Sequence, residues 1–180
     1  MNLPTHQQCI ELFDEYKVPD NVRRHSFCVN KVAVFLARKL REKGIEIDVE
    51  LVDRASLLHD LDKIPTLDKP GHGEMTEKIL LEKGHHPKIG KIIKKHCFNA
   101  ILDNGLETWE EKLVNYSDKK CREDSIVTLH ERFEYGKKRY PHLRGPRTNE
   151  AEQLFLDFEK EVFNIIRLDP EKLKEYVENG

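Results

Sequence analysis

A histidine and an aspartate stand side by side where an apolar stretch of the chain ends. His59 and Asp60 directly follow the Ala-Ser-Leu-Leu run of residues 55–58. A buried carboxylate needs an opposite charge or a metal ion to offset its lost hydration. Further imidazoles and carboxylates precede and follow the pair: His25, His72, His96 and Asp118. Together these residues predict a metal site with four to six nitrogen and oxygen ligands.

Imidazoles and carboxylates suit Fe, Mn, Zn, Co or Ni, and Mg²⁺ also accords with carboxylate ligands. Such a site keeps positions for water, and the ion lowers the pKa of that water and polarises a phosphoryl oxygen. A second ion, bridged by Asp60 and held by His72 and His96, would give a two-metal hydrolytic centre. A lone inward histidine is more often a hydrogen-bonded core residue, and Asp118 alone would be read as a helix-packing ion pair. One shared site accounts for all of them.

The elements that must position these residues are helices. Hydrophobic periodicity and helix caps predict helices that begin at Thr5, Asp20, Asp48, Met75, Pro87 and Thr108, and further helices over 124–140, 149–167 and 170–178. The stretches 62–73 and 141–148 are rich in Pro and Gly and predict a loop and a linker. Strand-like alternation is nearly absent. The fold class is therefore all-α, a compact irregular multi-helix bundle.

Each candidate ligand falls on an inward face or near a helix end. His25 lies on the apolar stripe of the helix from Asp20, and Asp118 lies on that of the helix from Thr108. His96 shares a stripe with the isoleucines that follow Pro87. His72 stands between two glycines at the start of the next helix, where a ligand can approach the backbone closely.

Composition limits the classes of partner. The chain has 180 residues, 36% of them charged, and a formal net charge of −2, which predicts one domain and argues against binding to nucleic acid or anionic membrane. No apolar run approaches the roughly 20 residues that span a bilayer, and the first residues show no signal pattern. A cytoplasmic location is expected. The four cysteines form no CxxC pair, so they are expected to be free thiols and not a zinc cluster.

Around these residues the chain resembles the HD superfamily of metal-dependent phosphohydrolases. The shared pattern is a His, a His-Asp pair and a distant Asp, found here in Arg-His-Ser at 24–26, Leu-His-Asp-Leu-Asp-Lys at 58–63 and Tyr-Ser-Asp-Lys at 116–119. The resemblance covers about residues 20–140. It predicts one HD-type domain over 1–180, with a helical extension at about 148–180.

The resemblance implies a role for each residue. His25, His59, Asp60 and Asp118 would hold the first metal. His72 and His96 would hold a second metal or contact phosphate, as in the dinuclear members that cleave diadenosine tetraphosphate or cyclic dinucleotides. Asp60 and Lys63 would be the catalytic residues, and the Lys63 ammonium suits substrate phosphate.

The expected activity is hydrolysis of a phosphomonoester or a nucleotide phosphate by a metal-activated water. The alternatives are a di-iron oxygenase of the same fold and a non-catalytic nucleotide-binding sensor. Asp62 departs from the family pattern, which has Gly or another small residue there, and no Gly-Tyr-Pro signature is present. Arg132 and Arg139 are interpreted as parts of a solvated helix face, with contact to phosphate as the alternative. The sequence names neither substrate, metal, oligomeric state nor pathway.

Overall fold

The computed structural model describes residues 1–67 and 69–179, without the side chain of His142. It confirms the all-α class. The helices are α1 (His6–Glu15), α2 (Asp20–Glu42), α3 (Val49–Leu58), α4 (Glu74–Glu82), α5 (Pro87–Lys94), α6 (Asn99–Leu102), α7 (Trp109–Lys119), α8 (Leu129–Arg139), α9 (Pro146–Ile166) and α10 (Leu173–Asn179). Short 3-10 turns, η1 (Pro141–Leu143) and η2 (Pro170–Lys172), precede α9 and α10.

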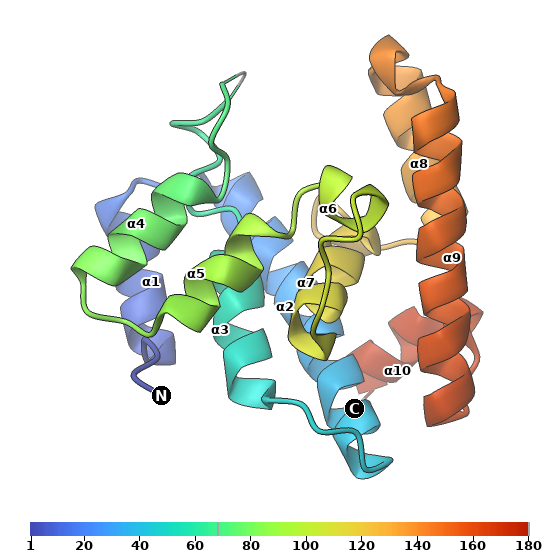
Figure 1. Cartoon of the computed structure of the whole chain (residues 1–180), viewed down its shortest axis with the longest axis horizontal. Helices are drawn as coiled ribbons and strands as arrows, with labels where there is room; N and C mark the ends of the chain where they lie inside the picture. The colour runs from blue at the N-terminus through green and yellow to red at the C-terminus, as the bar shows by residue number, and fades with distance from the viewer. Residues whose placement is uncertain (68, 180) are drawn as a thin grey trace.

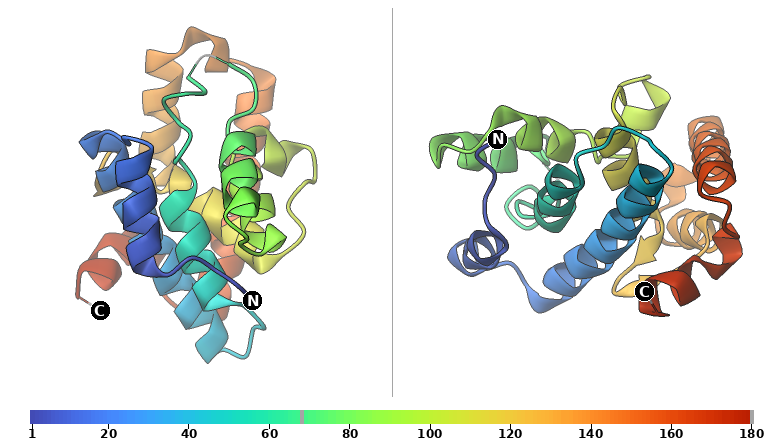
Figure 2. Two further views of the ribbon diagram at one scale, coloured as in Figure 1. Left: turned by 90° about the vertical axis from the view of Figure 1, so that its left-hand side faces the viewer. Right: turned by 90° about the horizontal axis from the view of Figure 1, so that it is seen from below.

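Helix α2 runs through the middle of the molecule (Figures 1 and 2) and packs against α3, α7 and α9. Its apolar stripe is fully buried at Val29, Val32, Leu36 and Leu40. Burying one such side chain stabilises a fold by about 1.5–3 kcal/mol, so this stripe organises the core. Helices α4 and α5 pair on one side of α2 and α3, and α8 and α9 pair on the other.

Helix starts follow the predicted caps. Thr5 and Thr108 each form a capping box with the residue three positions on, and the Asp48 side chain accepts a hydrogen bond from the Leu51 amide. The structure adds a third box at Thr128 and Glu131, which opens α8. The sequence prediction of a helix from 124 is therefore wrong at its start, because a capping threonine satisfies the first amides only where it stands.

Other boundaries also differ from the predictions. Helix α7 ends at Lys119, and the chain forms a two-stranded antiparallel hairpin of β1 (Cys121–Arg122) and β2 (Ser125–Ile126). Helix α5 ends at Lys94, so His96 lies in the turn after the helix and not on its stripe. The short α6 was not expected. Helix α9 begins at Pro146 rather than 149, since proline suits the first helical position.

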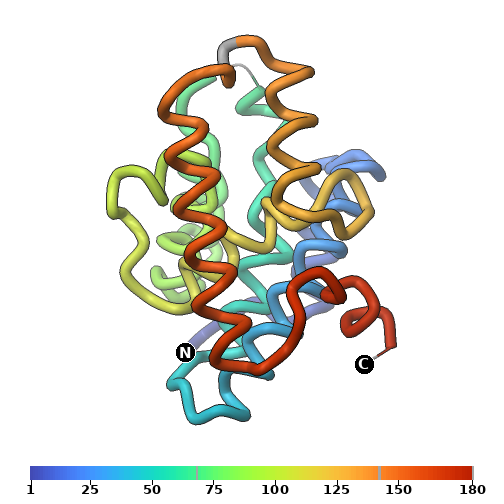
Figure 3. The backbone as a smooth tube through the Cα atoms, turned by 90° about the vertical axis from the view of Figure 1, so that its right-hand side faces the viewer, coloured from blue at the N-terminus to red at the C-terminus, as the bar shows by residue number. Residues whose placement is uncertain are grey.

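Two segments rise on the same side of the molecule. The predicted loop that leads from α3 to α4 forms one, and the tip where η1 joins α8 to α9 forms the other (Figure 1). Helices α8 and α9 lie side by side and run in opposite directions (Figure 3). No helix in the described part of the chain is long and apolar enough to cross a membrane.

A buried polar cluster joins α9 to α7. Glu159 on α9 accepts hydrogen bonds from the Tyr116 hydroxyl and from Lys120 Nζ, the latter at 2.9 Å. Tyr116 and Lys120 are 0% and 2% exposed. Burial, followed by the charge of Glu159, raises the pKa of Tyr116 well above its usual value and keeps its hydroxyl a donor.

Glu159→Ala should lower the free energy of unfolding by about 3–5 kcal/mol, because it leaves the Lys120 ammonium buried without a counter-charge. Urea denaturation followed by circular dichroism measures the change. Glu161→Ala, at an exposed position on the same helix, is the matched control and should unfold like the wild type. Equal stability of the two variants would contradict this role for Glu159.

Candidate metal centre

Four imidazoles surround the carboxylate of Asp60. Nε2 of His25 and of His59 lie 3.9 and 3.6 Å from Asp60 Oδ2. Nε2 of His72 and of His96 lie 3.0 and 3.6 Å from the other oxygen, Oδ1. One carboxylate therefore faces two separate pairs of imidazole nitrogens, as a carboxylate that bridges two ions would.

His59 and His96 each stand just after the end of a helix. Nδ1 of His59 donates to the Ser56 carbonyl at 2.7 Å, and Nδ1 of His96 donates to the Ile93 carbonyl. The last carbonyls of a helix have no partner within the helix, so both rings satisfy a group that needs a donor. Because Nδ1 is the donor, each ring directs its Nε2 toward Asp60.

His25 and His72 are oriented by contacts with more distant residues. Nδ1 of His25, on α2, donates to the Glu123 carbonyl in the β1–β2 turn at 2.9 Å. Nδ1 of His72 lies 2.8 Å from Asp62 Oδ1 and 3.1 Å from Thr66 Oγ1. These contacts hold the protonated Nδ1 of each ring away from Asp60 and direct Nε2 toward it.

Asp118 completes the group around His59. Its Oδ1 lies 3.0 Å from His25 Nε2 and 3.9 Å from His59 Nε2. His59 is fully buried, and its Nε2 has no hydrogen-bond partner among the described residues. A buried lone pair that faces the carboxylates of Asp60 and Asp118 fits a cation between them. The donor set His25, His59, Asp60 and Asp118 therefore fits a divalent metal ion.

Asp62 fixes the segment that carries His72. Its Oδ2 accepts the Gly73 and Thr76 amides at 2.9 and 3.1 Å, so the carboxylate caps the start of α4. Gly73 has φ +84°, and a Cβ there would approach Lys94 Cα to 2.9 Å, so only glycine fits beside α5. The departure from the family pattern at Asp62 thus has a structural role that the sequence analysis missed.

The charges of the centre are strongly coupled. Burial lowers the pKa of His59 to about 3. Burial alone would raise the pKa of Asp60, but His59, His72, His96 and Lys63 hold it well below its usual value. Burial opposes protonation of His72 too, yet the carboxylates of Asp60 and Asp62 raise its pKa to about 9. Asp60 is therefore a permanent anion at neutral pH.

Two lysines border the centre. Lys63 Nζ lies 3.0 Å from Asp60 Oδ2 and its side chain is 44% exposed, so the ammonium stands at the rim. Lys119 Nζ donates to Asp118 Oδ2. The sequence analysis quoted Lys119 within a motif but gave it no role, and the neighbouring Asp118 is the local signal for it.

Two sets of ligand atoms each lie within 4.8 Å of one another: those of His25, His59 and Asp60, and those of His72, His96 and Cys97. The first set contains three of the residues predicted to hold the first metal. The second pairs the two histidines predicted for a second metal or phosphate with Cys97, which the sequence analysis left out. Burial raises the pKa of the Cys97 thiol, so the thiol, and not the thiolate, is the form that lies there.

A sequence model of the HD domain matches residues 22–136. Because that span is more than half of the chain, the chain belongs to the HD domain family, which lies within the superfamily of metal-dependent phosphohydrolases. The matched span contains His25, His59, Asp60, His72, His96 and Asp118.

Two relatives were found by sequence. An uncharacterised protein of Methanocaldococcus jannaschii is 34% identical over 111 residues, which cover 55% of this chain and 65% of that protein. A tRNA (cytidine(56)-2′-O)-methyltransferase of Picrophilus torridus is 29% identical over 139 residues, which cover 71% of this chain and 39% of that protein. The chain thus spans less than two thirds of the length of either relative. No solved structure matches.

Asp62→Asn should lower the free energy of unfolding by about 2 kcal/mol, because it weakens charge-assisted hydrogen bonds to the start of α4 and the contact with His72. Urea denaturation in the presence of a chelator measures the change. Asp103→Asn is the control, since Asp103 forms an ion pair with Arg147 in which both side chains are more than 60% exposed. A stability for Asp62→Asn equal to that of the control would contradict the capping role.

The pKa of His72 predicts a pH dependence after treatment with a chelator. A histidine whose pKa is raised by folding, here from 6.5 to about 9, stabilises the fold fully below about pH 6.5. That stabilisation is lost as the pH rises through about 9. The unfolding temperature should therefore fall over this window, and His72→Gln should flatten the fall. His130→Gln, at an exposed position, should leave it unchanged. A wild-type curve that matches His72→Gln would disprove the assignment.

Proposed function

We propose that the chain is a metal-dependent phosphohydrolase that acts on a phosphomonoester or a nucleotide phosphate. The observation that carries the proposal is the position of Asp60, whose two carboxylate oxygens each face a pair of imidazole Nε2 atoms. Such a donor set suits Fe, Mn, Zn, Co or Ni, and also Mg²⁺ where carboxylates dominate. Membership of the HD domain family supports the reaction class.

In this proposal His25, His59, Asp60 and Asp118 hold the first ion, and His72 and His96, with Asp60, hold a second ion or contact phosphate. A bound divalent ion supplies a water of lowered pKa and polarises a phosphoryl oxygen. The fixed Nδ1 contacts of the rings pre-orient the donors, so little reorganisation accompanies binding of the ion.

Lys63 would contact the substrate phosphate. Burial lowers its pKa, but Asp60 and Asp118 raise it above the ordinary lysine value, so the side chain stays cationic at neutral pH. Its exposed ammonium at the rim can offset charge that develops on the phosphoryl oxygens. Asp60, which accepts from Lys63 Nζ, positions that cation as well as the ion.

We further propose that residues 1–180 act as one HD-type domain, with α9 and α10 as an extension of a core at about 20–140. A cytoplasmic location belongs to the same proposal, since cysteines without a CxxC pair are expected to stay free thiols in a reducing compartment. A small phosphorylated compound or nucleotide is the proposed substrate. The name of the Picrophilus torridus relative concerns tRNA, which makes nucleotide compounds the first group to screen.

Asp60→Asn should remove most of the bound metal and lower the hydrolysis rate at least about a thousandfold, because several kcal/mol of charge stabilisation depend on the ion. Elemental analysis of the purified protein measures the metal. A panel of p-nitrophenyl phosphate and nucleotides, assayed with Mn²⁺, Co²⁺, Zn²⁺ or Fe²⁺, measures the rate. Asp103→Asn serves as the control for a surface carboxylate.

An Asp60→Asn variant with undiminished hydrolysis would refute the proposal. Wild-type protein that binds nucleotides tightly without turnover in any metal would instead support a sensor. Oxygen consumption by an iron-loaded form with a mixed-valence signal would support an oxygenase.

A further inference from the structure

A cavity borders the candidate metal centre. It has a volume of about 430 Å³ and lies between α6, α8 and the start of α9, with Phe98, Lys119, Arg132, Phe133 and Leu143 among its lining residues. Ligand pockets usually measure about 300–1,000 Å³. Since Lys119 lines this cavity and also donates to Asp118, the cavity adjoins the candidate metal centre.

Arg132 lacks a counter-charge there. Its side chain is half-buried, its Nε is buried, and no hydrogen bond or ion pair satisfies the guanidinium among the described residues. Lys137, which also lines the cavity, is paired with Glu152 at 2.7 Å. A buried donor without a partner is costly in a native fold. The guanidinium fork matches the oxygens of phosphate or carboxylate.

The charge of Arg132 also acts on the proposed catalytic lysine. Burial lowers the pKa of Lys63, and the positive charge of Arg132 lowers it further, against the larger effect of Asp60 and Asp118. Lys63, after α3, and Arg132, on α8, thus bring two interacting positive charges from segments far apart in the chain. The sequence analysis placed Arg132 on a solvated face, and the structure corrects this.

Arg139 differs from Arg132 although both belong to α8. It is exposed, donates to the Tyr135 hydroxyl at 2.7 Å and stacks on the rings of Tyr135 and Tyr140. The solvated face predicted by the sequence holds for Arg139. It therefore offers a matched control, with the same charge on the same helix.

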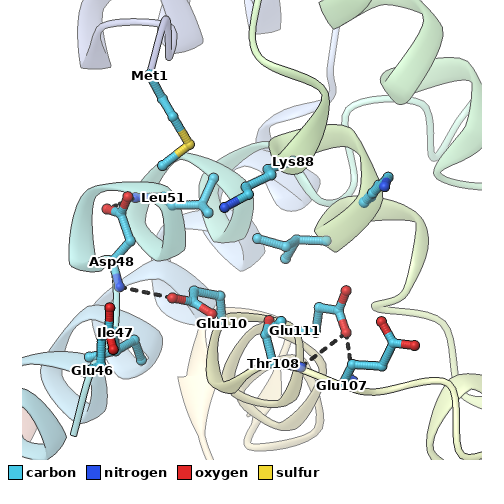
Figure 4. A pocket seen from close by; sticks show the side chains of 12 residues that line it. Met1, Glu46, Ile47, Asp48, Leu51, Lys88, Glu107, Thr108, Glu110 and Glu111 are labelled. Atoms are coloured by element: carbon cyan, nitrogen blue, oxygen red, sulfur yellow. Dashed lines mark hydrogen bonds between the residues drawn. The ribbon is translucent and has the colours of Figure 1, made fainter.

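Aromatic rings form part of the cavity wall. The rings of Phe98 and Phe133 contact each other with centroids 6.2 Å apart, and Phe133 packs on Phe155 behind it. A cavity of similar size between α3, α5 and α7 is different (Figure 4), because acidic side chains line it. There Glu110 accepts the Asp48 amide and Glu111 accepts the Thr108 amide, so these carboxylates are occupied by the fold.

We propose that the cavity beside α8 binds the part of the substrate beyond the reacting phosphoryl group, with Arg132 on a second anionic group and Phe98 against an apolar ring. This inference rests on the proposed function. It narrows the proposed substrates to organic phosphoanhydrides, because a compound whose single phosphate lies at the metal centre would leave Arg132 without an anionic partner. Phosphate binding at the metal centre and binding in the cavity can then be measured separately.

Isothermal titration calorimetry at a fixed free Mn²⁺ concentration tests this with three probes: inorganic phosphate, methylenediphosphonate and the α,β-methylene analogue of adenosine diphosphate. In the last two a methylene group replaces the oxygen between the phosphorus atoms, so this link is not hydrolysed. Arg132→Gln should weaken binding of both two-phosphorus probes about tenfold to a hundredfold, the range for hydrogen bonds to a charged group. It should change phosphate binding less than about threefold, since that contact is at the metal centre.

Phe98→Ala should weaken binding of the nucleoside analogue alone, and Arg139→Gln should weaken none of the probes. Thermal unfolding of each variant verifies that it is folded. Equal weakening of phosphate and diphosphonate by Arg132→Gln, or no weakening of either, would overturn the proposal.

The two proposals fail in different ways. Arg132-dependent binding of the diphosphonate without turnover of any phosphate compound would refute the phosphohydrolase and leave the cavity assignment standing. Hydrolysis that depends on Asp60, together with diphosphonate binding unchanged in Arg132→Gln, would refute the cavity assignment alone.

Discussion

Asp60 carries a negative charge although the residue is only 2% exposed. The need to compensate this buried charge is the constraint on which the arrangement of the bundle depends. A buried anion is stable only when cations or hydrogen-bond donors surround it. Imidazoles from α2, the end of α3, the loop before α4 and the turn after α5 surround it. His72 and Lys63 supply cationic donors, and the Nε2 atoms of His25, His59 and His96 would hold a metal cation beside the carboxylate. All four segments must be in place together, which ties the centre to the closure of the whole fold.

The helix ends determine which ring nitrogen of the neighbouring histidines faces Asp60. The final carbonyls of α3 and α5 need donors, and the Nδ1 atoms of His59 and His96 supply them. The same hydrogen bond sets the ring tautomer, so one local interaction satisfies the backbone and directs Nε2 inward. Asp62 acts similarly from the other direction, since it caps the start of α4 and contacts Nδ1 of His72. The unpaired backbone groups at helix ends thus orient the side chains of the candidate ligands.

Positively charged side chains lie around the candidate metal centre. Lys63 at the rim pairs with Asp60, and the buried Lys119 pairs with Asp118. Arg132 is left without a partner among the described residues. The buried Glu159 cluster fixes α9 against α7, and α9 packs on α8, which carries Arg132. The C-terminal helices therefore do more than cover the core: they hold one wall of the cavity that adjoins the proposed metal centre.

The sequence by itself determined the all-α class, the capped helix starts and the residues that converge on Asp60, because caps and apolar periodicity are local signals. It also placed His59 and Asp60 at a helix end. Only the tertiary structure decided that Asp62 contacts His72 and that Cys97 approaches His72 and His96. It also decided that Arg132 is half-buried while Arg139 is exposed. Those outcomes depend on distances between segments far apart in the chain, which one helix face cannot encode. The start of α8 was also decided there, since the hairpin at 121–126 takes residues that the amphipathic pattern had assigned to the helix.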